Sequence, residues 1–228
     1  IQTALAVAQG ALALVLLAGA TLSVRSFQNL RSETLGFDPE GALTLRVRLP
    51  QGGGDGQTDP VAYARMLLDR VVALPGVAAA GITNLPPLAF EMGSAHRVRL
   101  PGAAAEHAVG ALSAVATPEY FAAAGIGLVE GRSFQDDPGG ASEGVILDAD
   151  LAGRLFGGEQ ATGKTVELQV FRGGWQWVPV PVVGVVGSVR TRGVRSEAFP
   201  ILYRSFWSHP TRSLGLMVRI RGNPSERL

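Results

Sequence analysis

The chain has 228 residues, a formal net charge of +1 and no cysteine. The charge gives no reason to expect a nucleic-acid partner, because the arginines are scattered along the chain and form no basic stripe. The absence of cysteine excludes disulfides, thiolate metal sites and cysteine nucleophiles. Since 46% of the residues are apolar, a sizeable core can be buried.

The first 24 residues carry no charged side chain, and Arg25 is the first charge in the chain. This length matches the roughly 20 apolar residues that a helix needs to cross a bilayer. The polar residues are too few to form one face of a soluble helix: Gln2, Thr3, Gln9 and Thr21. We therefore predict a transmembrane helix over 1–24. A secretory signal peptide is the alternative, because LAGA (17–20) resembles a small-residue cleavage site.

A strand–helix–strand unit is predicted directly after this segment. Residues 43–49 (LTLRVRL) alternate apolar and polar side chains, which indicates a strand with one buried face. Asp59 and Pro60 provide an N-cap and a first helical residue for the following apolar stripe. A second strand is predicted over 77–85, after the Pro75-Gly76 stop.

Shorter elements follow from Pro86 to about His209. Two short helices are expected, one over 118–124 that ends at Gly125 and one over 149–156 that Asp148 caps. Alternating or apolar runs predict strands at 96–100, 111–116, 143–148, 165–171, 177–189 and 200–205. Pro179 and Pro181 favour an edge position for the strand that contains them.

The fold class predicted is α+β, with a two-lobe domain over 25–228 behind the transmembrane helix. Two strands under one helix bury too little surface to be stable alone, so a third strand is needed. Residues 214–221 alternate like the first strand and supply it. In a split βαβ arrangement the late strand lies between the first two and antiparallel to both. The expected base is therefore 43–85 with 214–228, and 86–212 form an inserted, mostly-β lobe.

The most enzyme-like feature is the string GEQATGKTVEL at 158–168, which fits the letter pattern of a phosphate-binding loop. A working loop follows a buried strand and opens a helix. Here a helix is expected before Gly158 and a strand after Lys164, which is the reverse order. We therefore predict that Gly163 makes a turn and that Lys164 has no nucleotide role.

The remaining polar clusters give no catalytic, cofactor-binding or metal-binding residues, so the protein is predicted not to be an enzyme and to need no cofactor. A loop turn explains Asp136 and Asp137, and a helix start explains Asp148 and Asp150. The histidines lie far apart and lack the spacing of metal ligands: His96, His107 and His209.

Two further patches are candidate interaction surfaces. The densest basic cluster could meet lipid phosphates or an acidic partner, although a solvated turn explains it better: Arg190, Arg192 and Arg195. Trp175 and Trp177 flank a glycine-rich turn, where they form an exposed interaction patch or cap a sheet.

Several segments, taken in chain order, resemble MacB/FtsX-type ABC transporter permeases. Residues 8–30 and 36–50 look like the first membrane helix and first strand of those proteins. Similarity to the MacB-like periplasmic core domain continues through 67–88, 117–137, 146–166, 182–203 and 216–224. The pattern is that of duplicated permeases which often lack a fused ATPase, and it covers essentially the whole chain.

The resemblance implies a non-catalytic extracytoplasmic domain behind the first of four membrane helices, in a bacterial inner membrane. It implies a cytoplasmic ATPase partner whose motions the membrane helices pass to this domain, and it allows a permease dimer. A glycine–lysine pair leads into a strand in that family without a nucleotide role, and Asp148 stands where relatives often have Asn. A secreted or anchored binding module behind a signal peptide is the main alternative, and a P-loop hydrolase is a weaker one.

Overall fold

The computed structural model describes residues 2–31, 35–50, 58–88, 94–135, 144–190 and 199–221. They belong to two compact units, 1–35 and 36–228. The first contains helix α1 (Gln2–Arg31), on which Leu12, Leu16 and Leu22 are exposed. Among the described residues, no helix combines the length and the apolar character that crossing a membrane requires. The transmembrane helix expected over 1–24 is thus not confirmed.

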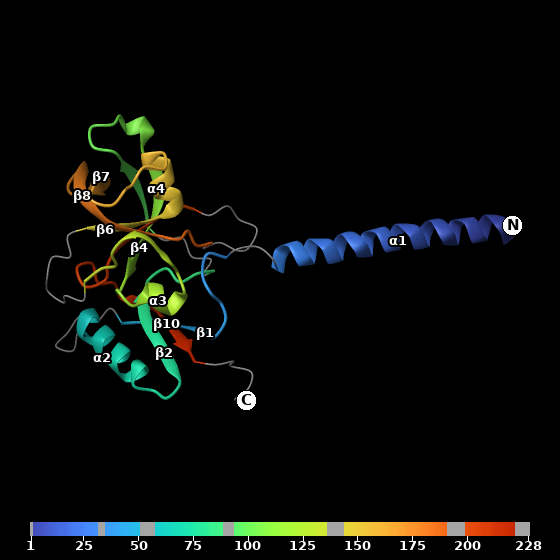
Figure 1. Cartoon of the computed structure of the whole chain (residues 1–228), viewed down its shortest axis with the longest axis horizontal. Helices are drawn as coiled ribbons and strands as arrows, with labels where there is room; N and C mark the ends of the chain where they lie inside the picture. The colour runs from blue at the N-terminus through green and yellow to red at the C-terminus, as the bar shows by residue number, and fades with distance from the viewer. Residues whose placement is uncertain are drawn as a thin grey trace. The chain divides into compact units, whose positions relative to one another are not determined.

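The second unit contains the three-stranded base sheet that the sequence predicts (Figure 1). Strands β1 (Ala42–Arg48) and β2 (Val77–Thr83) flank β10 (Ser213–Ile220), which runs antiparallel to both. The predicted central position of the late strand is therefore confirmed.

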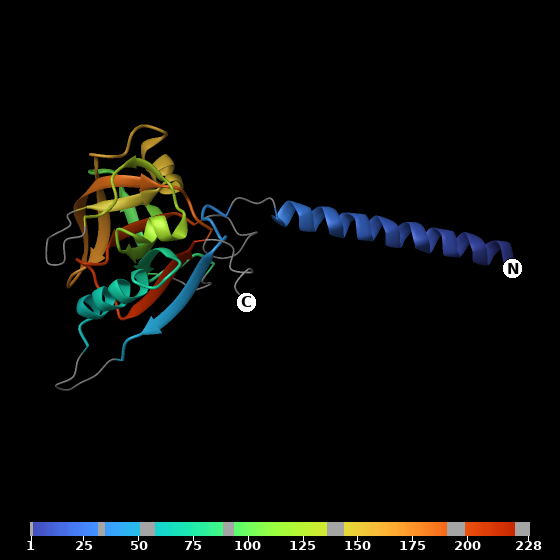
Figure 2. The same ribbon diagram turned by 60° about the horizontal axis from the view of Figure 1, so that its bottom comes forward.

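Helix α2 (Pro60–Val72) covers one face of the base sheet, and Figure 2 shows it lying along the strands. It begins as predicted, with the Asp59 carboxylate accepting from the Val61 amide at 3.0 Å. The buried residues of α2 pack with inward-facing residues of all three strands and of the 206–208 turn. This cluster consists of Ala64, Leu68, Val47, Ala80, Ile82, Phe206, Trp207, Leu214 and Leu216.

The segment between β2 and β10 forms a closed ring of strands. The ring order is β4 (Val109–Ala116), β3 (Ser94–Arg99), β7 (Thr165–Phe171), β8 (Trp175–Val186), β6 (Val145–Asp148) and β9 (Ile201–Ser205). Parallel pairing of β9 with β4 closes the ring. A short 3₁₀ turn, η1 (Ala105–His107), joins β3 to β4, and β5 (Leu128–Gly131) pairs with β8 outside the ring.

Helix α4 (Ala149–Phe156) packs against the inside of this ring. Its N-cap is Asp148 and its C-cap is Gly157 in the left-handed conformation, as the local pattern predicts. Leu151 and Leu155 share one hydrophobic cluster with inward-facing strand residues, among them Val98, Val166 and Leu202. The ring is therefore a filled barrel with a side-chain core, as small closed barrels generally are.

The edge position expected for the proline-containing strand is wrong, because β8 lies between β7 and β6 in the ring. Pro179 and Pro181 pair with β7, whereas pairing with β6 begins at Val182. The two prolines therefore lie where one side of β8 has no strand partner among the described residues, and no ladder hydrogen bond is lost there. The sequence pattern did not predict β5, whose four residues are too few to show an alternation.

Helix α3 (Tyr120–Ala124) lies where the base sheet meets the ring, and it packs on β2 and β10. β2 and β4 pair at one position, Thr83 with Ala116. Just beyond that position the Thr117 hydroxyl accepts from the Ile82 amide at 3.1 Å. Base sheet and ring thus belong to the same compact unit, joined by a short hydrogen-bonded contact and by α3.

Candidate functional site

Arg219 near the end of β10 holds together three parts of the fold that are distant in sequence. Its guanidinium donates to the Asp38 carboxylate at 2.7 Å and to the Asp38 and Glu40 carbonyls, both at 2.8 Å. It also donates to the Ala123 carbonyl of α3 at 3.1 Å. The lead-in segment (36–41), the last strand and α3 therefore meet at one side chain. We call these contacts the Arg219 junction.

The junction is tightly packed as well as hydrogen-bonded. Gly125 follows α3 with φ +67°, and a Cβ there would lie 2.6 Å from the Asp38 Cβ and 2.9 Å from the Arg219 Nη2. The Asp38 amide donates to the Ala124 carbonyl at 3.0 Å. A glycine is needed at this position both for the left-handed backbone and for the close approach of Asp38.

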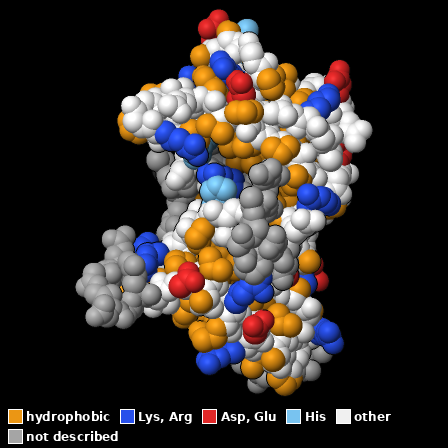
Figure 3. Space-filling model, turned by 90° about the vertical axis from the view of Figure 1, so that its left-hand side faces the viewer, with side chains coloured by type: hydrophobic (Ala, Val, Ile, Leu, Met, Phe, Trp, Pro, Cys, Tyr) orange, Lys and Arg blue, Asp and Glu red, His pale blue; other side chains and the backbone are white. Residues whose placement is uncertain are grey.

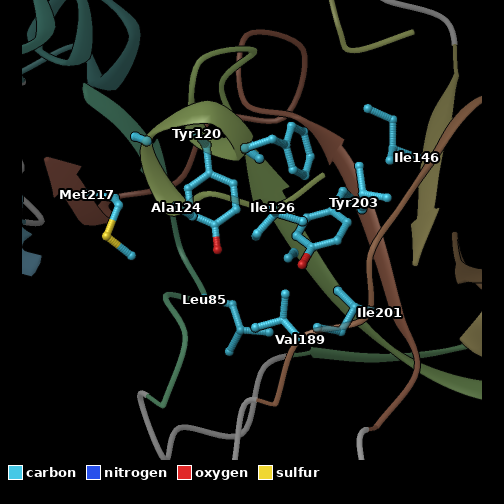
Figure 4. Close-up of a cluster of buried hydrophobic side chains, with 14 of the residues drawn as sticks. Leu85, Tyr120, Ala124, Ile126, Ile146, Val189, Ile201, Tyr203 and Met217 are labelled. Carbon is cyan, nitrogen blue, oxygen red and sulfur yellow. The ribbon is translucent and has the colours of Figure 1, made fainter. Parts of the chain in front are cut away.

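Side chains of α3 continue the connection into the ring. Tyr120 and Phe121 are buried beside Tyr203 of β9, and the Phe121 and Tyr203 rings meet edge to face at 5.2 Å. Figure 4 shows the Tyr120 and Tyr203 rings within one cluster, with Leu85, Ile126 and Val189 nearby. Met217 of β10 belongs to the same cluster, which therefore spans base sheet and ring.

The closest approach of α3 to the base sheet is at Gly81 of β2. A Cβ at this position would lie 2.3 Å from the Tyr120 Cα and 2.4 Å from the Tyr120 nitrogen. No side chain fits between these two backbones, so α3 sits directly on the strand. The backbones of β2 and α3 are therefore in direct contact at this position.

The loop that fits the phosphate-binding letter pattern is bonded within the chain. The amides of Ala161 and Thr162 donate to the Glu130 carboxylate at 3.1 and 3.3 Å. Those of Gly163 and Lys164 donate to backbone carbonyls at 2.9 and 3.1 Å. The amides that would have to hold a phosphate are therefore already bonded. The Lys164 ammonium pairs with Glu159 at 2.7 Å, and α4 precedes the loop as predicted.

The acidic candidates have structural roles where the structure describes them. Asp148 Oδ1 accepts from the Leu151 amide at 2.9 Å, and Asp150 pairs with Arg154 at 2.9 Å. Burial raises the pKa of Asp148 to about 6, against the opposing effect of the Leu151 amide. No group of three or more acidic or histidine side chains suited to a metal occurs in the described ranges. Asp136 and Asp137 lie outside the described residues.

The residues of the other candidate patches have different surroundings in the structure. Trp177 lies within β8, where the Arg99 guanidinium stacks 4.0 Å above its ring. Trp175 is 69% exposed and contacts Phe171 edge to face. His96 is on β3, His107 is in η1 and His209 contacts Arg204. Of the basic cluster, Arg192 and Arg195 lie outside the described residues.

Sequence reasoning singled out neither Arg219 nor Asp38. Arg219 occupies an ordinary polar position of an alternating strand, and Asp38 precedes a proline in a polar connector. The two are 181 positions apart in the chain. No local pattern could have paired them, because the contact depends on β10 lying beside β1.

The fold defines a class: a small βαβ base with an inserted closed barrel. The periplasmic region of MacB from Actinobacillus actinomycetemcomitans has a similar fold, with a TM-score of 0.50 and 17% identity over 87% of this chain and 83% of that one. The extracellular domain of the noncanonic ABC-type transporter YknZ from Gram-positive bacteria matches with a TM-score of 0.47 and 17% identity, over 79% and 84% of the two chains. Among curated proteins, no sequence matches this chain.

The family follows from the sequence itself. The profile of the MacB-like periplasmic core domain matches residues 1–223, which is nearly the whole chain. The chain belongs to that family, and the resemblance drawn from its segments is confirmed.

Proposed function

We propose that this chain is the extracytoplasmic domain and first membrane helix of an ABC-transporter permease of the MacB-like duplicated group. Its role is to carry conformational change between the membrane and the space outside it, without catalysis. The Arg219 junction is the observation that supports this role most directly. It ties the segment after α1 and the last strand to one short helix, α3, which packs against the ring.

The domain has a base (43–85 and 214–228) and an inserted lobe (86–212) in this proposal. Motion of membrane helices enters the base through the two chain ends. It reaches the barrel through α3, because Gly81 lets the helix rest directly on β2 and Tyr203 of the barrel packs against its aromatic rings. Close-packed interiors transmit displacement with little compression, so base and barrel move together.

The partners follow from the same role. A cytoplasmic ATPase subunit supplies the energy, two permease copies assemble around it, and the location is a bacterial inner membrane with the domain on the periplasmic side. Exposed leucines on α1, such as Leu12 and Leu17, suit contact with lipid or with another membrane helix. If this arrangement is right, expression in bacterial cells should leave the chain, with residues 1–24 retained, in the membrane fraction. A soluble mature form that begins near residue 20 favours the alternative of a secreted binding module.

A spin-label experiment on the full-length permease and its ATPase tests the mechanical role. These 228 residues contain no cysteine, so Ala104→Cys places a single exposed label on the barrel once any cysteine elsewhere in the full-length permease is replaced. In a dimer the two labels report the distance between barrels. We expect this distance to change between the nucleotide-free and ATP-bound states, because the membrane helices drive the base.

Variants at the junction supply the control. Asp38→Asn and Arg219→Gln weaken the contact between the lead-in segment and α3, and both should reduce the ATP-dependent distance change. Arg48→Gln, on the exposed side of neighbouring β1, should leave it intact. If the barrels keep one distance in every nucleotide state, or if junction variants respond like the parent while folded, the mechanical role is wrong.

A further inference from the structure

A pocket of about 640 Å³ opens beside the start of β3, the β7–β8 turn and β9. Its polar lining is basic, with three arginines and a histidine: Arg97, Arg172, Arg204 and His96. Phe171 and Trp175 form its aromatic rim. On the face seen in Figure 3, a histidine lies beside Lys or Arg side chains in a hollow.

Arg204 is the central cation of this pocket. It lies two residues after Leu202, on the face of β9 that points into the barrel core, and it is partly buried. Its Nη2 contacts His209 Nε2. Burial lowers the pKa of Arg204, and the like charge of Arg172 lowers it further. Within the described ranges, no carboxylate forms an ion pair with Arg97, Arg172 or Arg204.

His209 fixes the direction of the Arg204 side chain. An arginine nitrogen can only donate, so His209 must offer an unprotonated Nε2. Burial lowers the pKa of His209, and the Arg204 charge lowers it further, which keeps the ring neutral at pH 7. One nitrogen of Arg204 thus has a neutral partner, and no carboxylate of the described residues forms an ion pair that would balance its positive charge.

We propose that this pocket binds an organic oxyanion, a carboxylate or phosphate group attached to an apolar or aromatic body. A partly buried arginine without a counter-ion is costly, and an oxyanion removes that cost. The planar fork of a guanidinium matches both carboxylate and phosphate oxygens. Phe171 and Trp175 are 67% and 69% exposed, and they offer the apolar part of such a ligand a surface to stack on.

The test uses small probes and the intact chain in detergent. Phenyl phosphate and phenylacetate carry the two oxyanions on the same ring, inorganic phosphate lacks the ring, and benzyl alcohol lacks the charge. Trp175 lines the pocket, so binding is followed by tryptophan fluorescence and by calorimetry. We expect saturable one-to-one binding of at least one aromatic anion, with weaker binding of inorganic phosphate and none of benzyl alcohol. The better of the two aromatic anions identifies the oxyanion.

Substitutions locate the site. Arg204→Gln and Arg172→Gln should each weaken binding about tenfold or more, as loss of a charge-assisted hydrogen bond requires. The exposed Arg132, which bonds the Ser133 carbonyl, is the matched control, and Arg132→Gln should bind like the parent. Trp175→Phe should lose most of the fluorescence response while calorimetry still detects binding. Equal affinity in all these variants, or no saturation by either aromatic anion at millimolar concentration, overturns the proposal.

A stability measurement distinguishes an open site from one in which a carboxylate of the chain already pairs with Arg204. If Arg204 has no carboxylate partner, Arg204→Met removes an uncompensated charge, and the melting temperature in anion-poor buffer should stay equal or rise. A lower melting temperature in that buffer would mean that the charge already has a partner within the chain, and the proposal would then be wrong.

Discussion

The contact between α3 and the base sheet can be tested by adding one methyl group. Gly81→Ala places a Cβ 2.3 Å from the Tyr120 Cα and 2.8 Å from the Glu119 carbonyl carbon. Ordinary contacts of this kind are at least about 3.4 Å, so α3 must move by roughly 1 Å. The neighbouring atoms are backbone, so no side-chain rotation can relieve the clash.

The loss in free energy of unfolding depends on the buried side chains of α3. Tyr120 and Phe121 are 1% and 6% exposed, and a shift of the helix disturbs their packing against Tyr203 and Met217. Overpacking a core costs about 1–3 kcal/mol, and a backbone clash belongs at the upper end of that range. For a folded unit of this size, about 3 kcal/mol corresponds to a fall in melting temperature of roughly 6–12 °C.

Gly110→Ala is the matched control. Gly110 is also a strand glycine, in β4, and a Cβ there meets nothing within 4 Å. We expect no loss of stability, or a gain of about 0.4–1 kcal/mol from lower entropy of the unfolded chain. Urea unfolding followed by tryptophan fluorescence compares the two variants. If Gly81→Ala and Gly110→Ala unfold at the same urea concentration, α3 does not rest on β2 as described.

Three further outcomes follow from the described contacts. Arg219→Ala removes four hydrogen bonds from a side chain that is 18% exposed, and should lower the free energy of unfolding by about 2–3 kcal/mol in urea titrations. The pKa of Asp148 is about 6 in the folded protein and 3.8 ordinarily, so the free energy of unfolding falls as pH rises from about 4 to 6. Asp148→Asn keeps an N-cap oxygen but has no charge to bury. This variant should therefore be more stable than the parent by about 2–3 kcal/mol at pH 7.5, and should show no such gain at pH 4. Millimolar ATP should leave the melting temperature unchanged in the parent and in Lys164→Ala, because Lys164 pairs with Glu159. If ATP raises the melting temperature of the parent and Lys164→Ala abolishes that increase, the nucleotide hypothesis is restored.

Elements with a strong local cause were predictable from sequence. Asp59-Pro60 begins α2, Gly125 ends α3, and the alternation of 43–49 and 215–221 marks β1 and β10. The central place of β10 followed from a topological argument, since two strands under one helix bury too little surface. The predicted order of a helix before the 158–164 loop and a strand after it is also found, as α4 and β7.

Features that depend on distant segments were not predictable. The closing of the ring needs β9 beside β4, in register Leu112 with Ile201, and nothing in either strand specifies that partner. The edge assignment of β8 failed because its prolines lie in the part of the strand that pairs with β7 alone among the described strands. The basic pocket escaped detection because Arg172, Arg204 and His209 are scattered in sequence and share a site through the fold.

We expect the stiffness of the link between base and barrel to depend on side-chain packing more than on strand pairing. Among the described strands, β2 and β4 share the single paired position of Thr83 and Ala116, and a ladder this short resists bending weakly. The cluster around Tyr120 and Tyr203 instead joins β10, α3 and β9 by packing, and packed interiors deform little. Substitutions that loosen this cluster should therefore uncouple base from barrel more effectively than loss of the Thr117 hydroxyl beside the ladder. The two routes can be distinguished by the width of the distance distribution between one spin label on the base and one on the barrel, measured in Tyr203→Leu and in Thr117→Val. A broader distribution in Tyr203→Leu alone supports the packed cluster as the stiff link. A broader distribution in Thr117→Val alone refutes it.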